Sequence, residues 1–132
     1  MTNLERLQAV EFCFNKLEYI LETYEKQRTM SNSLVSHLDG VTVQKNKNVH
    51  KVEEAVIQVE KLKELAEIWQ GRYIEAWNEA EKVIDKISDP TANAILHYKY
   101  LLLFDWATIA QKTGKKESRC KTLHTMALKQ LQ

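Results

Sequence analysis

Residues 49–87 read VHKVEEAVIQVEKLKELAEIWQGRYIEAWNEAEKVIDKI, and this stretch decides the fold class. Apolar side chains recur along it at steps of three or four residues, which is typical of one stripe on an α-helix. The stripe consists of Val49, Val52, Val56, Val59, Leu62, Ala66, Trp69, Tyr73, Ala76, Ala80, Val83 and Ile87. One short step, from Val59 to Leu62, interrupts the coiled-coil alternation and predicts a local overwinding. The stripe needs a partner: the first helix folded back, a second copy of the chain, or both.

The segments before this stretch predict a second helix and a loop. Thr2 and Glu5 form a capping box at the start of another apolar stripe, which runs to about residues 26–28. Its members are Leu4, Leu7, Val10, Phe14, Leu17, Leu21 and Tyr24. Residues 29–48 lose the helical period and are rich in Ser and Asn, so we expect a flexible loop there.

The composition excludes several classes of protein. Only 3 Gly and 1 Pro occur in 132 residues, too few for the turns of a β-sandwich or barrel, so the chain is expected to be all-α. It contains no apolar run long enough to span a membrane. Glu5 and Glu11 lie where a signal peptide would be basic or apolar, which argues against a signal peptide. Cys13 and Cys120 are far apart in the sequence, which argues for reduced cysteines. These features predict a reduced, cytoplasmic protein.

The charges are distributed unevenly, although the net charge is only +1. Residues 111–132 carry six basic side chains against Glu117 alone. Residues 1–110 carry 13 basic and 17 acidic side chains. A concentrated positive field of this kind favours binding to nucleic acid.

The C-terminal segment predicts a three-helix module over residues 88–132, preceded by a helical oligomerisation arm over residues 1–87. Asp89 and Pro90 begin a helix that is expected to run to about Leu103 and to bury Ile95, Tyr98 and Leu102. Asp105 can cap a short helix from Trp106 to about Lys112, which Gly114 ends. A final helix from about Glu117 to Leu131 completes a helix-turn-helix arrangement.

The final helix has two different faces. The side expected to be buried contains Cys120, Leu123 or His124, Ala127, Leu128 and Leu131. The opposite side and the preceding turn are polar and basic, which suits the phosphates and base edges of a DNA major groove. The candidate DNA-binding residues are Lys115, Lys116, Glu117, Ser118, Arg119, Lys121, Thr122 and Thr125.

No enzymatic or metal-binding motif stands out. Cys120 and His124 stand four residues apart and could form half of a metal site, but no second pair of ligands accompanies them. The sequence contains neither a phosphate-binding glycine loop nor a nucleophile elbow. We therefore expect no metal, no cofactor and no catalytic activity.

The module resembles two groups of proteins. The residues that carry the resemblance are Ile95, Leu96, Tyr100, Trp106, Ala107, Ile109, Ala110, Gly114, Leu123, His124, Ala127 and Leu128. They are similar to region 4 of sigma factors and, more closely, to phage and prophage transcription regulators of the ArpU and RinA type. Two positions depart from the pattern: Thr113 replaces a usual leucine, and Lys116 replaces a usual capping serine.

The resemblance implies a sequence-specific DNA-binding regulator, encoded by a phage or prophage, that activates late genes in a bacterial cytoplasm. The expected partners are double-stranded DNA and, because of the length of the stripe over residues 49–87, further copies of the chain in a homo-oligomer, with a dimer favoured. Two alternatives stay open. One is a small terminase subunit that binds viral DNA for packaging, and the other is a helical adaptor that contacts RNA polymerase.

Overall fold

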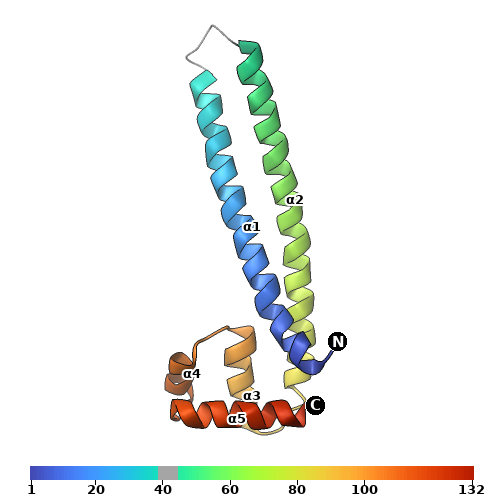
Figure 1. The fold of residues 1–132 in the computed structure, drawn as a ribbon, viewed down its shortest axis with the longest axis vertical. Coiled ribbons are helices and arrows are strands. Elements are labelled where there is room, and N and C mark those ends of the chain that lie inside the picture. The colour runs from blue at the N-terminus through green and yellow to red at the C-terminus, as the bar shows by residue number, and fades with distance from the viewer. Residues whose placement is uncertain (39–44) are drawn as a thin grey trace. The chain divides into compact units, whose positions relative to one another are not determined.

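The computed structural model describes the backbone of residues 1–38 and 45–132 and the side chains outside residues 34–50. Two long helices, α1 (Asn3–Leu38) and α2 (Lys45–Ile84), precede three shorter ones (Figure 1). These are α3 (Pro90–Leu96), α4 (Trp106–Thr113) and α5 (Glu117–Gln130), with a π-helical segment, η1 (His97–Leu101), after α3. Neither described range contains a strand, so the all-α class is confirmed. No helix in these ranges is long and apolar enough to cross a membrane.

The loop expected over residues 29–48 is largely helical instead. Helix α1 continues to Leu38 and α2 begins at Lys45, so the expected boundaries are wrong at both ends. Residues 29–38 are polar, but they contain neither Pro nor Gly, and nothing local stops the helix. Residues 39–44 lie outside the described residues, and for them the expectation of a flexible loop stays a prediction.

The chain divides into two compact units. Unit 1 comprises residues 1–14 and 72–132, and unit 2 comprises residues 15–71. The boundary expected between residues 87 and 88 therefore lies inside unit 1. The start of α1 and the last turns of α2 belong to the same compact body as the three short helices.

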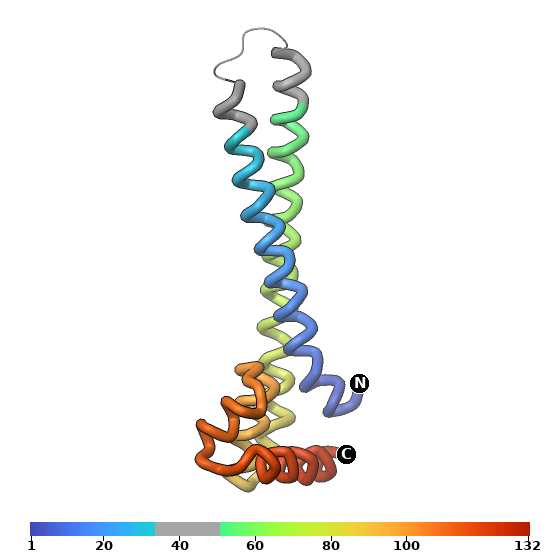
Figure 2. The backbone as a smooth tube through the Cα atoms, turned by 60° about the vertical axis from the view of Figure 1, so that its left-hand side comes forward, coloured from blue at the N-terminus to red at the C-terminus, as the bar shows by residue number. Residues whose placement is uncertain are grey.

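Unit 2 is a pair of helical segments that lie side by side (Figures 1 and 2). On α1 the least exposed side chains recur at alternating steps of three and four: Leu17, Ile20, Tyr24, Gln27 and Ser31. On α2 the corresponding positions are Val52, Ala55, Val59, Leu62, Ala66 and Trp69. Two stripes with this spacing form an antiparallel coiled-coil seam. Lys16 covers the edge of this seam, with its Nζ 5.8 Å from the centre of the Trp69 ring.

The seam corrects the stripes expected from the sequence. On α1 it passes through Ile20, whereas Leu21 is 45% exposed. In unit 1, Cys13 is likewise buried and Phe14, which the expected stripe contained, is 38% exposed. On α2 it passes through the half-buried Ala55 rather than Val56, which is 47% exposed. With Ala55 in the seam the three–four alternation is unbroken. The expected overwinding between Val59 and Leu62 is therefore wrong.

Unit 1 has one principal core, to which every helix except α4 contributes. Its members are Leu7, Val10, Ala80, Val83, Ile84, Ile87, Ala92, Leu96, Leu101, Ala127 and Leu131. The side-chain amide of Asn93 reinforces this core by donating to the carbonyl oxygens of Ile84 and Ile87, each at 3.1 Å. Ile84 is the last residue of α2 and Ile87 lies in the connection to α3, so this amide joins the start of α3 to the end of α2.

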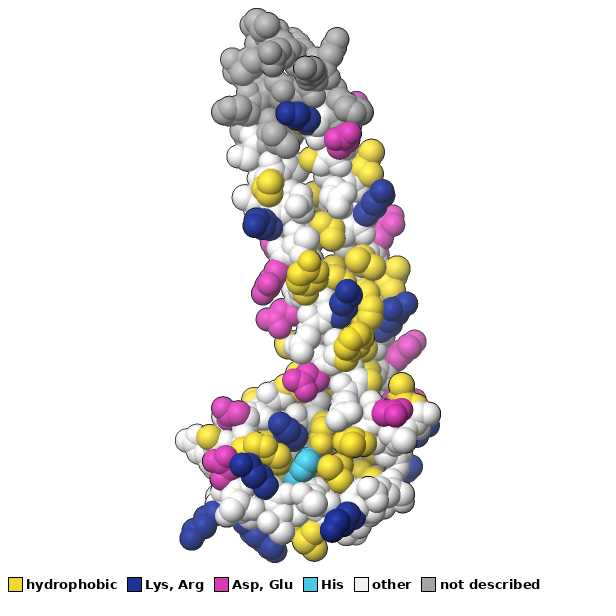
Figure 3. All heavy atoms as spheres, viewed as in Figure 1, with side chains coloured by type: hydrophobic (Ala, Val, Ile, Leu, Met, Phe, Trp, Pro, Cys, Tyr) yellow, Lys and Arg dark blue, Asp and Glu magenta, His cyan; other side chains and the backbone are white. Residues whose placement is uncertain are grey.

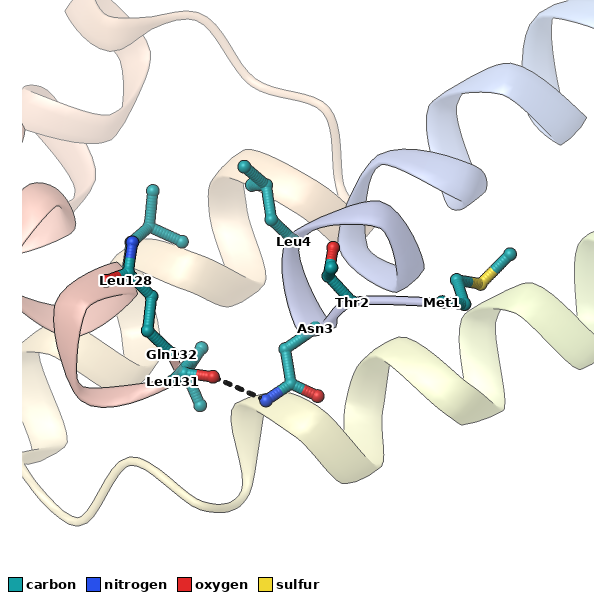
Figure 4. Close-up of a pocket in the computed structure, with 7 residues that line it drawn as sticks. All are labelled: Met1, Thr2, Asn3, Leu4, Leu128, Leu131 and Gln132. Atoms are coloured by element: carbon teal, nitrogen blue, oxygen red, sulfur yellow. Dashed lines mark hydrogen bonds between the residues drawn. The ribbon is translucent and has the colours of Figure 1, made fainter.

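In unit 1 the first residues of the chain are hydrogen-bonded to the last ones. Thr2 and Glu5 form the expected capping box, because each backbone N–H donates to the other side chain, at 3.2 and 3.1 Å. The Asn3 Nδ2 atom donates to the carbonyl oxygen of Leu131 at 2.6 Å (Figure 4). An apolar cavity of about 610 Å³ lies beside this hydrogen bond, lined by residues 1–4 together with Leu128, Leu131 and Gln132.

The helix expected from Thr91 to Leu103 changes its winding partway. It begins as expected, with Pro90 in the first turn and the Asp89 carboxylate accepting from the Ala92 N–H at 2.9 Å. From His97 it becomes π-helical, and the N–H of Leu102 donates to the carbonyl of His97. The wider turn changes the phase of the side chains that follow it. Leu101 is therefore buried, and Leu102, which the α-helical spacing placed in the core, is 48% exposed.

The seam predicts that alanine substitutions at two adjacent residues of unit 2 will differ in their effect on stability. Ile20 is 2% exposed and Leu21 is 45% exposed. We expect Ile20→Ala to lower the free energy of unfolding by about 2–4 kcal/mol, because it leaves a cavity in the seam. Leu21→Ala should lower it by less than about 1 kcal/mol. Urea denaturation followed by circular dichroism measures both, and equal effects would contradict this seam.

Candidate functional site

Helix α5 is held by a second, smaller core within unit 1. Ile95 of α3, Ile109 of α4 and Cys120 of α5 are fully buried against one another. The partly buried side chains around them are Tyr98, Phe104, Trp106, Ala110 and Leu123. The side of α5 expected to face inward therefore does so, and the outward side is presented by a three-helix support.

The turn between α4 and α5 has the geometry that the sequence predicts. The Asp105 carboxylate caps α4 by accepting from the Thr108 N–H at 2.8 Å. Gly114 ends α4 in the left-handed conformation, with φ of 70°, which a glycine adopts without strain. The Lys115 N–H then donates to the Ala110 carbonyl at 3.2 Å. These local bonds set where α5 begins.

Thr113, one of the two departures from the resemblance, is accommodated inside the module. Its hydroxyl donates to the carbonyl oxygen of Ile109 at 2.9 Å. The Thr113 hydroxyl oxygen also lies 3.4 Å from the Cys120 Sγ atom of α5. The threonine thus satisfies its own hydroxyl and contacts α5 where a leucine would supply apolar packing alone.

All eight candidate DNA-binding residues are exposed, and all lie on the turn or the outward face of α5. Five of them line a shallow, open depression: Lys115, Lys116, Ser118, Arg119 and Thr122. Lys and Arg side chains are visible at the corner where α4 meets α5 (Figure 3). The structure therefore brings the basic turn and the first turns of α5 together on one surface of unit 1.

Four of the eight candidates have side-chain partners within α5. The Thr122 hydroxyl donates to the Ser118 carbonyl, and the Thr125 hydroxyl donates to the Lys121 carbonyl, each at 3.0 Å. These hydroxyl oxygens can still accept a hydrogen bond from a ligand. The Lys121 Nζ atom lies 3.5 Å from a Glu117 carboxylate oxygen, so Glu117 neutralises part of the positive charge of this face.

Tyr100 and His124 form a polar contact that the sequence analysis missed. The Tyr100 hydroxyl lies 2.7 Å from the His124 Nε2 atom and connects η1 to α5. The Trp106 and His124 rings pack in a T-shaped arrangement, and the Lys99 ammonium lies 5.1 Å from the centre of the Trp106 ring. Sequence spacing could not reveal this cluster, because the π-helical turn sets the direction of Tyr100.

Burial changes the acidity of both members of this pair. Burial raises the pKa of Tyr100, so the phenol keeps its proton. Burial, and then the positive charge of Lys99, lower the pKa of His124 from its ordinary value of 6.5. A neutral imidazole can accept the phenol hydrogen at Nε2, so the pair forms with both groups uncharged.

The described residues contain no cluster of three or more His, Cys, Asp or Glu side chains that could hold a metal ion. Cys120 is fully buried beside Thr113, and His124 is paired with Tyr100, so these two residues serve the packing of α5. No family model matches this chain, and no curated protein or solved structure matches it significantly.

The lowered pKa of His124 predicts a dependence of stability on pH. In the unfolded chain His124 binds a proton at higher pH than in the folded one, so protons stabilise the unfolded state as the pH falls. We expect the free energy of unfolding to decrease between pH 7.5 and 5.5. His124→Gln, which does not titrate, should show a smaller decrease. Urea denaturation at both pH values measures this, and parallel decreases in the two proteins would contradict it.

The missing cap of α5 predicts a stabilising substitution. Lys116 has the extended backbone of an N-cap residue, but its side chain makes no capping hydrogen bond. Lys116→Ser should supply one and raise the free energy of unfolding by about 1 kcal/mol. Lys115→Ser removes the same charge one residue earlier and is the matched control. Chemical denaturation compares them, and an equal gain in both would attribute the effect to charge alone.

Proposed function

We propose that this protein is a sequence-specific DNA-binding regulator that reads double-stranded DNA with the exposed face of α5. The observation that carries the proposal is the division of α5 into two faces. Cys120 and Ala127 are buried in the two cores of unit 1, while the face between Ser118 and Thr125 is exposed, polar and basic. A supported helix with such a face is what major-groove recognition requires.

The charges of this surface suit phosphates on both sides of a groove. Lys115 and Lys116 precede α5, and Arg119 lies in its first turn. Long basic side chains at these positions can contact the DNA backbone, while the shorter Ser118 and Thr122 between them allow close approach. Lys121 lies on the same face, where Glu117 neutralises part of its charge, and we expect it to contact a base edge.

The sequence resemblance supports a narrower form of the proposal. It favours a phage or prophage regulator that activates late genes in a bacterial cytoplasm. The alternative of a protein adaptor is favoured by one feature. Glu117 places a negative charge at the start of α5, where DNA phosphates would approach. An adaptor would bind a protein such as RNA polymerase through the same face.

Removing phosphate contacts should weaken DNA binding in a way that depends on salt. We expect Arg119→Ala to reduce affinity for all sequences and to lower the slope of log affinity against log salt by about one unit. Thr122→Ala should instead reduce discrimination at one base pair by about 1–3 kcal/mol. Lys129→Ala is the control, because Lys129 lies in the last turn of α5, at the opposite end of the helix from Lys115 and Lys116.

Fluorescence anisotropy measures both quantities on two DNAs, at two salt concentrations. One is a duplex selected by this protein from a random library, and the other is a random-sequence duplex. If the parent protein binds neither at low salt, DNA binding is wrong and the adaptor becomes the better account. If Lys129→Ala weakens binding as much as Arg119→Ala, the contact surface lies elsewhere on the module.

A further inference from the structure

Helix α5 packs against α3 and α4 and rests on both apolar cores of unit 1 (Figure 1). Cys120 is fully buried in the smaller core, and Ala127 is buried in the principal core. His124 follows Cys120 by four residues and precedes Ala127 by three, so it lies on the same side of α5, between the two cores. Apolar packing is non-directional, so the cores alone define the rotation of α5 about its own axis only loosely.

The hydrogen bond between Tyr100 and His124 supplies a directional contact. Its two atoms are 2.7 Å apart, and a hydrogen bond of this length holds its partners in a narrow range of angles. The two rings also stack, with centres 5.6 Å apart, and Trp106 of α4 packs on the histidine. The contact of Thr113 with Cys120 is weaker, because sulfur is a poor hydrogen-bond partner. The His124 ring is therefore the point at which η1 and α4 together hold α5.

The backbone that presents Tyr100 departs twice from regular geometry. The segment His97–Leu101 is π-helical, a form that is rare and is frequent at functional sites. Leu103 then has φ of 57°, a left-handed conformation that is strained for a leucine. The Nδ1 atom of His97 is buried and bonds to no other polar atom of the described residues. Each of these features costs energy locally, so tertiary contacts must hold the segment in this form.

The rotation of α5 matters because its outer face lies opposite His124. Thr122 precedes His124 by two residues, which places it about 200° away around the helix. Side chains extend roughly 5–6 Å from the helix axis, so a rotation of about 20° moves an outer side chain by roughly 2 Å. A side chain that recognises a ligand has to be held within about 0.5 Å of its productive position. A small rotation of α5 would therefore misplace the whole outer face.

We propose that Tyr100 is a positioning residue that acts through His124 to fix the rotation of α5. It thereby sets the direction of the outer side chains Ser118, Thr122 and Thr125. This second step rests on the proposed function, because it takes these side chains to read DNA, whereas the fixing of α5 does not. The π-helical turn serves the same contact, since an uninterrupted α-helix would give Tyr100 a different direction.

The orientation of α5 can be measured without DNA. Residual dipolar couplings of the backbone amides give the orientation of α5 relative to α3 and α4 in the full chain. We expect Tyr100→Phe, which removes only the hydroxyl group, to rotate α5 relative to the other two helices. Tyr98→Phe is the matched control, because Tyr98 lies in the same segment and its ring stacks on Phe104. An unchanged orientation in Tyr100→Phe, or an equal change in both variants, would overturn the proposal.

Two variants of His124 separate positioning from simple packing. His124→Gln retains a hydrogen-bond acceptor and should keep the parental orientation of α5, whereas His124→Leu retains bulk alone and should not. A second readout is the pKa of His124, measured by NMR titration of the imidazole. The phenol donates to the neutral imidazole and favours that form, so Tyr100→Phe should raise this pKa. A pKa that does not rise, or a glutamine variant that behaves like the leucine variant, would contradict positioning through this pair.

Sequence discrimination tests the step that rests on the proposed function. We expect Tyr100→Phe to reduce the ratio of affinities for the selected and the random duplex by about fivefold, which corresponds to one weakened base contact. The salt dependence of binding should not change, because no phosphate contact is removed. His124→Gln should keep the parental ratio. If the parent protein binds neither duplex, the proposed function fails, and the dipolar couplings still decide whether Tyr100 positions α5. If α5 rotates while discrimination is unchanged, the outer face does not read bases.

Discussion

Ile84, the last residue of α2, and Ile87, which follows it in the connection to α3, are buried because side chains from several other segments pack over them. Leu7 and Val10 come from α1, Leu96 from α3, and Ala127 and Leu131 from α5. Burying such a side chain contributes about 1.5–3 kcal/mol, and none of these helices could bury its own apolar stripe alone. This packing buries the inner face of α5 in the core. The outer face packs against no other helix of unit 1, so it is exposed.

The features that could be predicted from the sequence are those decided by near neighbours. The capping box of Thr2 and Glu5, the cap at Asp105 and the left-handed Gly114 each involve residues at most four positions apart. The choice between Ile20 and Leu21 is different, because both are apolar and lie on adjacent positions of α1. Only the partner helix decides which of them is buried, and a single stripe carries no information about its partner.

The other differences between the sequence-based expectations and the structure also arise from contacts with residues that are distant in the sequence. Residues 29–38 are polar, yet they stay helical because no breaker is present and Ser31 continues the seam. The exposure of the outer face of α5 was predictable, since charged side chains are seldom buried. The contact between Tyr100 and His124 could not be predicted, because it depends on the π-helical turn at His97–Leu101. No local sequence motif indicates that turn.

The hydrogen bond between Asn3 and Leu131 joins residues 128 positions apart in the chain. During synthesis the first turns of α1 emerge from the ribosome long before α5 exists. Leu7 and Val10 can find α2 once residue 87 has emerged, but their contact with Ala127 and Leu131 must wait for the last helix. The nascent chain therefore carries an incompletely covered apolar surface for most of its synthesis. A ribosome that stalls before α5 would leave that surface exposed to chaperones and to other nascent chains.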